Sequence, residues 1–163
     1  MNSEEALIKA FDQYADAIFR FCFYRVFDRE KARDLTQDAF ARTWEYLQKG
    51  KQIDNYRAFL YRTARNLIID QSRKKRELSL EELQEQGTDF GFTDIEKIET
   101  ALDAEALVAR LGELPEEYQE ALILRFVEDM NIAEIAAMLG ERENTISVRL
   151  HRGINKLREL VKT

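Results

Sequence analysis

The segment 131–158 limits the possible fold more than any other part of the chain, because it contains two stretches of helical periodicity separated by a glycine. Apolar residues recur three and four positions apart before Gly140 and again after Asn144, which could cap a second helix. That second helix would carry Arg149 and Arg152 on its outer side. Two helices joined by a tight turn, the second one basic, fit a DNA-binding helix-turn-helix. An ordinary pair of packed helices with a solvated basic face would give the same pattern, and the segment alone does not decide between them.

Helical periodicity also runs through most of the remaining chain. With 6 Gly and 1 Pro among 163 residues, and without strand-like alternation, the sequence predicts an all-α protein. A hydrophobic content of 45% is enough for packed cores. We expect two small helical domains joined by an acidic linker. The first domain would cover residues 1–76, the linker 77–94 and the second domain 95–163.

The sequence also bears on the compartment. No apolar run approaches the ~18–20 residues that a membrane-spanning helix needs, so we expect no membrane insertion. The first residues lack the basic and apolar stretches of a signal peptide. The single cysteine, Cys22, lies between Phe21 and Phe23, which suggests a buried thiol in a reducing compartment. A cytoplasmic protein is the simplest interpretation.

The formal net charge of −6 conceals a strong segregation of charge along the chain. Residues 56–76 carry seven bases against one acid, a net charge of +6. Residues 77–120 carry fourteen acids against two bases, a net charge of −12, and residues 142–162 return to +4 with six bases and two acids. Two basic elements separated by an acidic one indicate two nucleic-acid-binding faces. Two solvated surface faces are the simpler alternative.

The helix predicted over residues 55–76 interleaves basic and aromatic side chains. Arginine suits phosphate binding because its planar fork can donate two parallel hydrogen bonds. We expect Tyr61 to face away from the buried side and to stack on an unpaired base, whereas Tyr56 and Phe59 are assigned to the core. The candidate nucleic-acid contacts on this helix are Tyr61, Arg62, Arg65, Asn66, Arg73, Lys74 and Arg76.

Residues for catalysis or metal binding are sparse. His151 is the only histidine and Cys22 the only cysteine, so the sequence offers neither a second histidine nor a second cysteine for a metal site. The sequence contains no glycine-rich phosphate loop. The many carboxylates lie in the acidic segment and at helix starts, where solvation and capping explain them. We therefore expect neither an enzyme nor a bound cofactor or metal.

Three ordered segments resemble the extracytoplasmic-function sigma factors, the small alternative sigma subunits of bacterial RNA polymerase. The segments are DLTQDAFARTWEYL at 34–47, NYRAFLYRTARNLIIDQSRKKRE at 55–77 and LPEEYQEALILRFVEDMNIAEIAAMLGERENTISVRLHRGINKLRE at 114–159. The resemblance covers nearly the whole chain and does not depend on any single segment. It implies a helical region 2 domain, a region 4 domain, and core RNA polymerase and promoter DNA as partners.

The resemblance further implies which surfaces meet which partner. A region 2 signature would dock on the β′ clamp helices of the polymerase, and its residues here are Asp34, Gln37, Asp38 and Glu45. The helix at 55–76, with the loop before it, would engage the minus-ten element and help to open the duplex. The core of region 4 would rest on the β flap. An anti-sigma factor is a further candidate partner, since many relatives are held inactive by one, although no residue identifies it.

The last helix would enter the major groove at the minus-thirty-five element. Its candidate DNA contacts are Thr145, Ser147, Val148, Arg149, Arg152 and Lys156. Family members often carry a basic residue followed by serine where this chain has Ser147 and Val148, and alanine where it has Gly153. Glu141 would also repel phosphates near the turn. We therefore expect a weaker contact or a different preferred sequence.

Two other functions fit part of the sequence. A sigma-like protein could bind polymerase or another partner without reading DNA, which would suit the altered last helix. A lone helix-turn-helix repressor would leave the segment at 34–47 unexplained.

Overall fold

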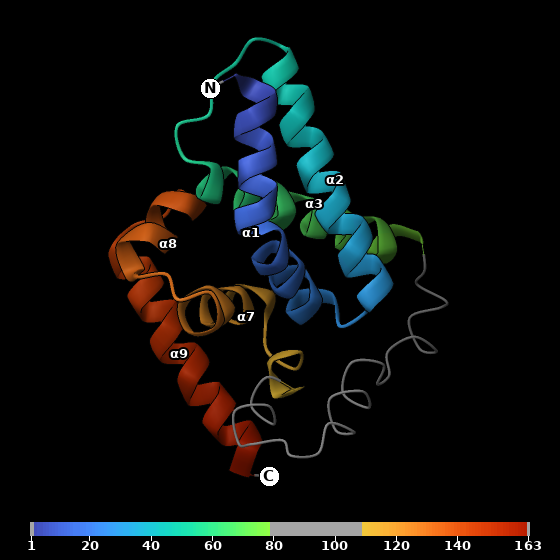
Figure 1. Ribbon diagram of the computed structural model, residues 1–163. Helices are drawn as coiled ribbons and strands as arrows, with labels where there is room; N and C mark the ends of the chain where they lie inside the picture. The colour runs from blue at the N-terminus through green and yellow to red at the C-terminus, as the bar shows by residue number, and fades with distance from the viewer. Residues whose placement is uncertain (1, 79–108, 163) are drawn as a thin grey trace. The chain divides into compact units, whose positions relative to one another are not determined.

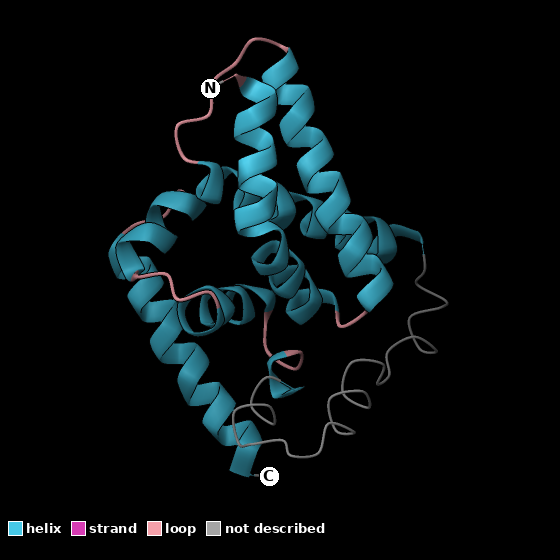
Figure 2. Cartoon of the chain, viewed as in Figure 1, coloured by secondary structure: helices cyan, strands magenta, loops and turns pink. Residues whose placement is uncertain are grey.

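The computed structural model describes residues 2–78 and 109–162, with side chains described for residues 2–74 and 109–161. Over these residues the regular structure is helical and contains no strand (Figure 2). The predicted all-α fold class is therefore confirmed. The chain divides into two compact units, Met1–Gln84 and Glu85–Thr163. The predicted acidic linker, residues 77–94, lies almost wholly outside the described residues, so the domain limits stay a prediction.

Three helices form the described part of the first unit: α1 (Ser3–Val26), α2 (Arg29–Gln48) and α3 (Tyr56–Leu78). Each of them packs against the other two (Figure 1). Each also begins at a side-chain cap, because the oxygens of Asn2, Asp28 and Asn55 accept a backbone N–H three residues later. The largest fully buried side chains that the helices contribute to the shared core are Tyr61, Phe21, Ile18, Leu35 and Leu60.

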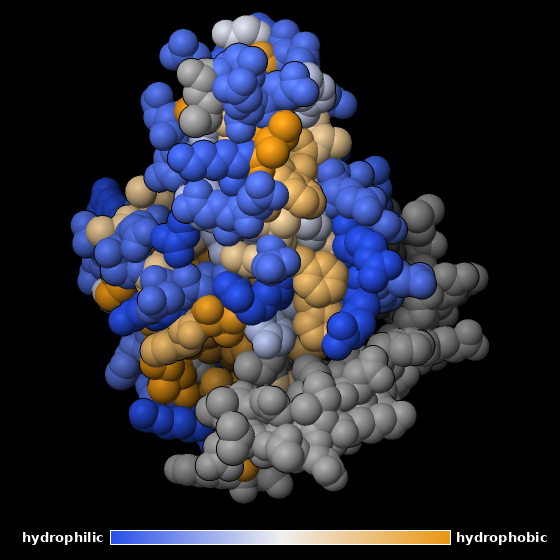
Figure 3. Space-filling view, in the orientation of Figure 1, coloured by the Kyte–Doolittle hydropathy of each residue, from blue (hydrophilic) through white to orange (hydrophobic). Residues whose placement is uncertain are grey.

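The surface of this unit is mostly hydrophilic on the face seen in Figure 3, apart from an apolar strip near α1 and α2. Two large apolar side chains of α1, Ile8 and Phe11, are at least half exposed. Phe11 nevertheless contacts α2, since its ring meets that of Phe40 edge-on at a centroid distance of 5.0 Å. Phe11 thus continues the α1–α2 packing out to the surface.

The second unit contains a helix-turn-helix. Helix α7 (Glu116–Leu122) continues through a π-helical turn, η1 (Ile123–Val127), before α8 (Ile132–Leu139) and α9 (Glu143–Lys162) follow. Gly140 ends α8 with a φ of 69°, a left-handed conformation that glycine adopts without the steric cost of a Cβ. The two helices predicted on either side of this glycine are therefore both present.

Helix α9 begins earlier than the sequence pattern predicts. The N–H of Ile146 already donates to the carbonyl of Arg142 at 3.2 Å, so the first helical turn includes Asn144. The prediction that Asn144 caps the helix from outside was wrong. Its side chain is instead exposed on the first turn of α9.

The start of α8 provides a first test of this fold. The Asn131 side chain accepts the N–H of Glu134, and the Glu134 side chain accepts the N–H of Asn131, which is a complete capping box. We expect Asn131→Ala to lower the free energy of unfolding of this unit by about 1 kcal/mol. Urea denaturation followed by circular dichroism measures the change. Asn144→Ala is the matched control, because no such cap depends on it, and an equal loss in both variants would contradict the assignment.

Candidate nucleic-acid and protein-binding faces

The outer side of α2 presents one acidic stripe. Leu35, Ala39 and Leu47 are buried on the opposite side of the helix. All four residues predicted to bind the polymerase are exposed on this stripe, namely Asp34, Gln37, Asp38 and Glu45. A shallow groove runs beside them, lined by Asp38, Ala41, Arg42, Glu45, Tyr46 and Lys49. The arrangement suits a partner that offers basic or amide side chains.

Helix α3 presents a basic side opposite its core. Arg62, Asn66, Arg73 and Lys74 are exposed and Arg65 is half-buried. Asp70 pairs with Arg73 at 3.7 Å and offsets part of the charge. Arg76 lies on the helix, but its side chain is outside the described residues. The structure thus places Arg62, Arg65 and Arg73 on one side of α3, whereas Lys74 lies about 20° around the helix axis from buried Leu67.

Tyr61 does not belong to this basic side, and its predicted outward orientation was wrong. It is 1% exposed, and its ring packs edge-on against Phe21 of α1 at a centroid distance of 5.4 Å. Around the helix axis Tyr61 lies only about 20° from buried Ile68. Because α3 packs against both α1 and α2, its buried arc is wide enough to include both residues. Tyr61 is therefore a core residue and cannot stack on a base from this position.

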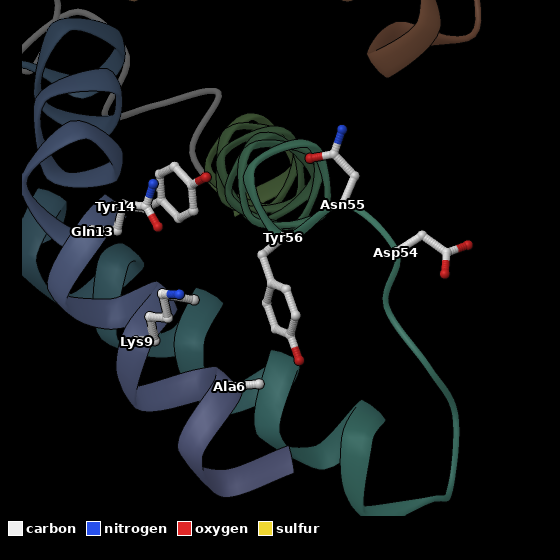
Figure 4. A pocket seen from close by; sticks show the side chains of 8 residues that line it. Ala6, Lys9, Gln13, Tyr14, Asp54, Asn55 and Tyr56 are labelled. Carbon is white, nitrogen blue, oxygen red and sulfur yellow. The ribbon is translucent and has the colours of Figure 1, made fainter. Parts of the chain in front are cut away.

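A cavity lies between α1 and the loop before α3. Its volume is about 370 Å³, and it is lined by Ala6, Lys9, Ala10, Gln13, Tyr14, Asp54, Asn55 and Tyr56. In Figure 4 the ring of Tyr56 extends toward the part of α1 that carries Ala6 and Lys9. The sequence assigned Tyr56 to the core, but it is half-buried and accessible from this cavity. The spacing of Ala6, Lys9 and Gln13 in the sequence predicts that they share one edge of a helix. Only the fold shows that this edge faces the loop before α3.

Helix α9 exposes only part of the residues predicted to contact DNA. Ser147, Val148, Arg152 and Lys156 are exposed, whereas Thr145 and Arg149 are half-buried. Sequence reasoning did not select several other residues that are exposed on or just before the helix, among them Arg142, Asn144 and His151. Asn144 lies four residues before Val148 and His151 three residues after it, and this spacing was the available signal for those two.

Among residues 2–74 and 109–161, no group of three or more His, Cys, Asp or Glu side chains is placed to hold a metal ion. None of the helices that the structure describes is long and apolar enough to cross a membrane.

Comparison with known proteins finds the same family in both units. The family described as Sigma-70 region 2 matches residues 10–77, and the family described as Sigma-70, region 4 matches residues 104–157. The chain is 27% identical over 169 residues to the ECF RNA polymerase sigma factor SigW of Bacillus subtilis, covering 97% of this chain and 90% of SigW. It is 30% identical over 162 residues to SigE of Mycolicibacterium smegmatis, covering 98% of this chain and 62% of SigE.

A solved structure has the same fold. The sigma factor RpoE, crystallised with the anti-sigma factor NepR from Bartonella quintana, is 24% identical in sequence and has a TM-score of 0.74, with 98% of each chain covered. This likeness concerns the fold alone.

Proposed function

Because this chain belongs to the sigma-70 family and is an extracytoplasmic-function sigma factor, we propose that its exposed faces divide the work of promoter recognition between them. A sigma factor binds core RNA polymerase and directs initiation at promoters, and it is an initiation factor rather than an enzyme. The observation that carries the proposal is that the acidic stripe, the basic side and the helix-turn-helix lie on different helices, each with its own buried side.

The acidic stripe of α2 is the proposed contact to the β′ clamp helices of the polymerase. Its members Asp34, Asp38 and Glu45 follow one another along the exposed side of a helix whose opposite side is fixed in the core. A rigid stripe of this kind can meet a basic helical surface without rearrangement.

The basic side of α3 and the cavity before it are the proposed contacts to the minus-ten element. Arg62 and Asn66 can hold the strand backbone, while the cavity offers the aromatic rings of Tyr14 and Tyr56 to a base that has left the duplex. Polar side chains of the same cavity, including Gln13, can donate to and accept from a base edge. This role replaces the stacking role that the sequence assigned to Tyr61.

Substitution of Tyr56 tests the cavity. We expect Tyr56→Ala to reduce open-complex formation about tenfold, because stacking contributes roughly 1–3 kcal/mol per base, and Tyr56→Phe to stay near wild type. Permanganate reactivity of unpaired thymines around the minus-ten element measures the open complex. Equal reactivity in the alanine variant and the wild type would exclude the cavity as the site of an unpaired base.

The helix-turn-helix is the proposed reader of the minus-thirty-five element, with the unit around it resting on the β flap. Each DNA contact alone would be weak and salt-sensitive, and tethering both to the polymerase raises their effective concentration at one promoter. We place this activity in the cytoplasm, where polymerase works. We also propose an anti-sigma factor as a further partner, since the Bartonella RpoE forms a complex with one.

Transcription with core polymerase tests the function directly. Core polymerase and the full chain are incubated with fragments of the encoding genome, and the 5′ ends of the transcripts are mapped. We expect transcripts that depend on this protein and share two upstream elements at a fixed separation. Polymerase binding without such transcripts would instead support the second candidate, a protein that occupies polymerase without reading DNA. That candidate is favoured by one observation, the pairing of Arg149 with acidic residues described below.

A further inference from the structure

One edge of α9 lies against α7 and is partly covered by it. Arg149 is half-buried, with its side chain 20% exposed. Its Nη2 lies 3.2 Å from Oε1 of Glu141 in the turn between α8 and α9, and its Nε lies 3.9 Å from Oε2 of Glu117 in the first turn of α7. The guanidinium therefore joins three elements. It also neutralises Glu141, the residue that the sequence analysis expected to repel phosphates.

The same edge continues along the helix. One turn after Arg149, a Cβ added to Gly153 would lie 3.3 Å from Tyr118 Cβ and 3.2 Å from Leu122 Cδ1, so α9 and α7 approach closely there. Further along, the amino group of Lys156 lies 5.9 Å from the centre of the Tyr118 ring. Arg149, Gly153 and Lys156 thus form a seam between α9 and α7, which we call the α7 seam.

Other residues of α9 point away from the α7 seam. Asn144, Val148 and Arg152 follow one another at intervals of four and are all exposed. Around the helix axis Val148 lies about 100° from Arg149 and about 140° from Gly153. A recognition helix reads base edges with the side that enters the groove, and mainly with its N-terminal turns. The side centred on Val148 can enter a groove while the α7 seam stays closed.

We propose that Arg149 is a positioning residue that fixes the angle of the recognition helix, and that Asn144, Val148 and Arg152 determine the sequence it reads. This rests on the proposed function, since it concerns the minus-thirty-five contact. The side chains suit different bases: an asparagine amide pairs with the N6/N7 edge of adenine, a valine contacts the methyl group of thymine, and an arginine donates to O6 and N7 of guanine.

A charge swap distinguishes positioning from direct contact. Arg149→Glu places a third carboxylate beside Glu117 and Glu141 and should lower transcript yield from a mapped promoter about tenfold or more. The double variant Arg149→Glu with Glu141→Arg restores an ion pair in the reverse direction and should recover to within about threefold of wild type. If Arg149 contacted DNA directly, a glutamate there would still face the phosphates, so a double variant as defective as the single one would overturn the proposal.

Base preference supplies a second readout that folding defects do not imitate. The minus-thirty-five element of the mapped promoter is randomised, and the sequences that the full holoenzyme transcribes are counted. We expect Arg149→Met to keep the preferred base at every position even if yield falls, and Asn144→Ala and Val148→Ala each to lose the preference at one position. Loss of a preferred base in Arg149→Met would overturn the proposal. A wild-type protein that yields no transcript at all would instead refute the proposed function.

Discussion

Reversing two charges on α2, Asp38→Lys together with Glu45→Lys, is expected to abolish initiation by the holoenzyme. Both side chains are exposed on the acidic stripe, so the core of Leu35, Ala39 and Leu47 stays intact and the unit should fold. Two like-charge contacts against a basic partner cost several kcal/mol, which corresponds to a loss of polymerase affinity of more than about 100-fold. Fluorescence anisotropy of the labelled chain, titrated with core polymerase, measures that affinity.

A matched control separates this docking contact from a general effect of charge. Asp12→Lys together with Asp16→Lys changes the net charge by the same amount on exposed residues of α1, in the same unit. We expect this control to bind core polymerase as the wild type does. The neutral pair Asp38→Asn and Glu45→Gln should fall between the two, because it removes the attraction without adding repulsion. Equal affinity of both lysine pairs for polymerase would show that the acidic stripe is not the docking surface.

The outer side of α2 could be predicted from sequence because its charged residues mark that side at helical spacing. Leu35 and Leu47 alternate with Asp34, Asp38 and Glu45 at helical spacing, so the pattern alone shows which residues face outward. For α3 the same reasoning failed at Tyr61. No charged residue marks the position of Tyr61, and periodicity alone does not reveal that the buried arc of α3 extends from Leu60 to Tyr61.

Contacts between distant segments could not be predicted at all. The partner of Arg149 on α7, Glu117, precedes it by 32 positions, and the cavity before α3 joins residues near Lys9 to residues near Asn55. The sequence identified the basic outer side of α9 but not the edge of it that α7 covers. Two of the six predicted contacts, Arg149 and Lys156, lie along that edge.

The structure explains why glycine stands at position 153, where family members often carry alanine. Judged by helix propensity, it costs α9 up to about 1 kcal/mol relative to alanine. In the structure it is buried, and a Cβ added to it would lie within 3.3 Å of Tyr118 and Leu122 of α7. The absent side chain lets the two helices pack more closely than an alanine would allow. Glycine therefore lowers the helix propensity of α9 but allows closer packing on α7. The size of the side chain at position 153 should decide which of the two effects on stability is larger.

A size series at Gly153 is expected to destabilise the second unit steeply. Gly153→Ala should change the free energy of unfolding by no more than about 1 kcal/mol, because the better helix propensity offsets a Cβ that Leu122 can partly accommodate. Gly153→Leu should cost about 3 kcal/mol, since the larger side chain has to separate α9 from α7 at Tyr118 Cβ, which cannot move without its helix. Opening this seam would also displace the recognition helix.

The only tryptophan of the chain, Trp44, lies on α2, so its fluorescence reports the unfolding of the first unit. Urea denaturation of Gly153→Leu should show an early transition by circular dichroism, while the fluorescence of Trp44 keeps its wild-type midpoint. Asn155→Leu is the matched control, because it adds a leucine to an exposed position of the same helix. It should leave the dichroism transition within about 0.5 kcal/mol of wild type. If Gly153→Leu and Asn155→Leu unfolded alike, the close approach of α9 to α7 would not be what requires a glycine at this position.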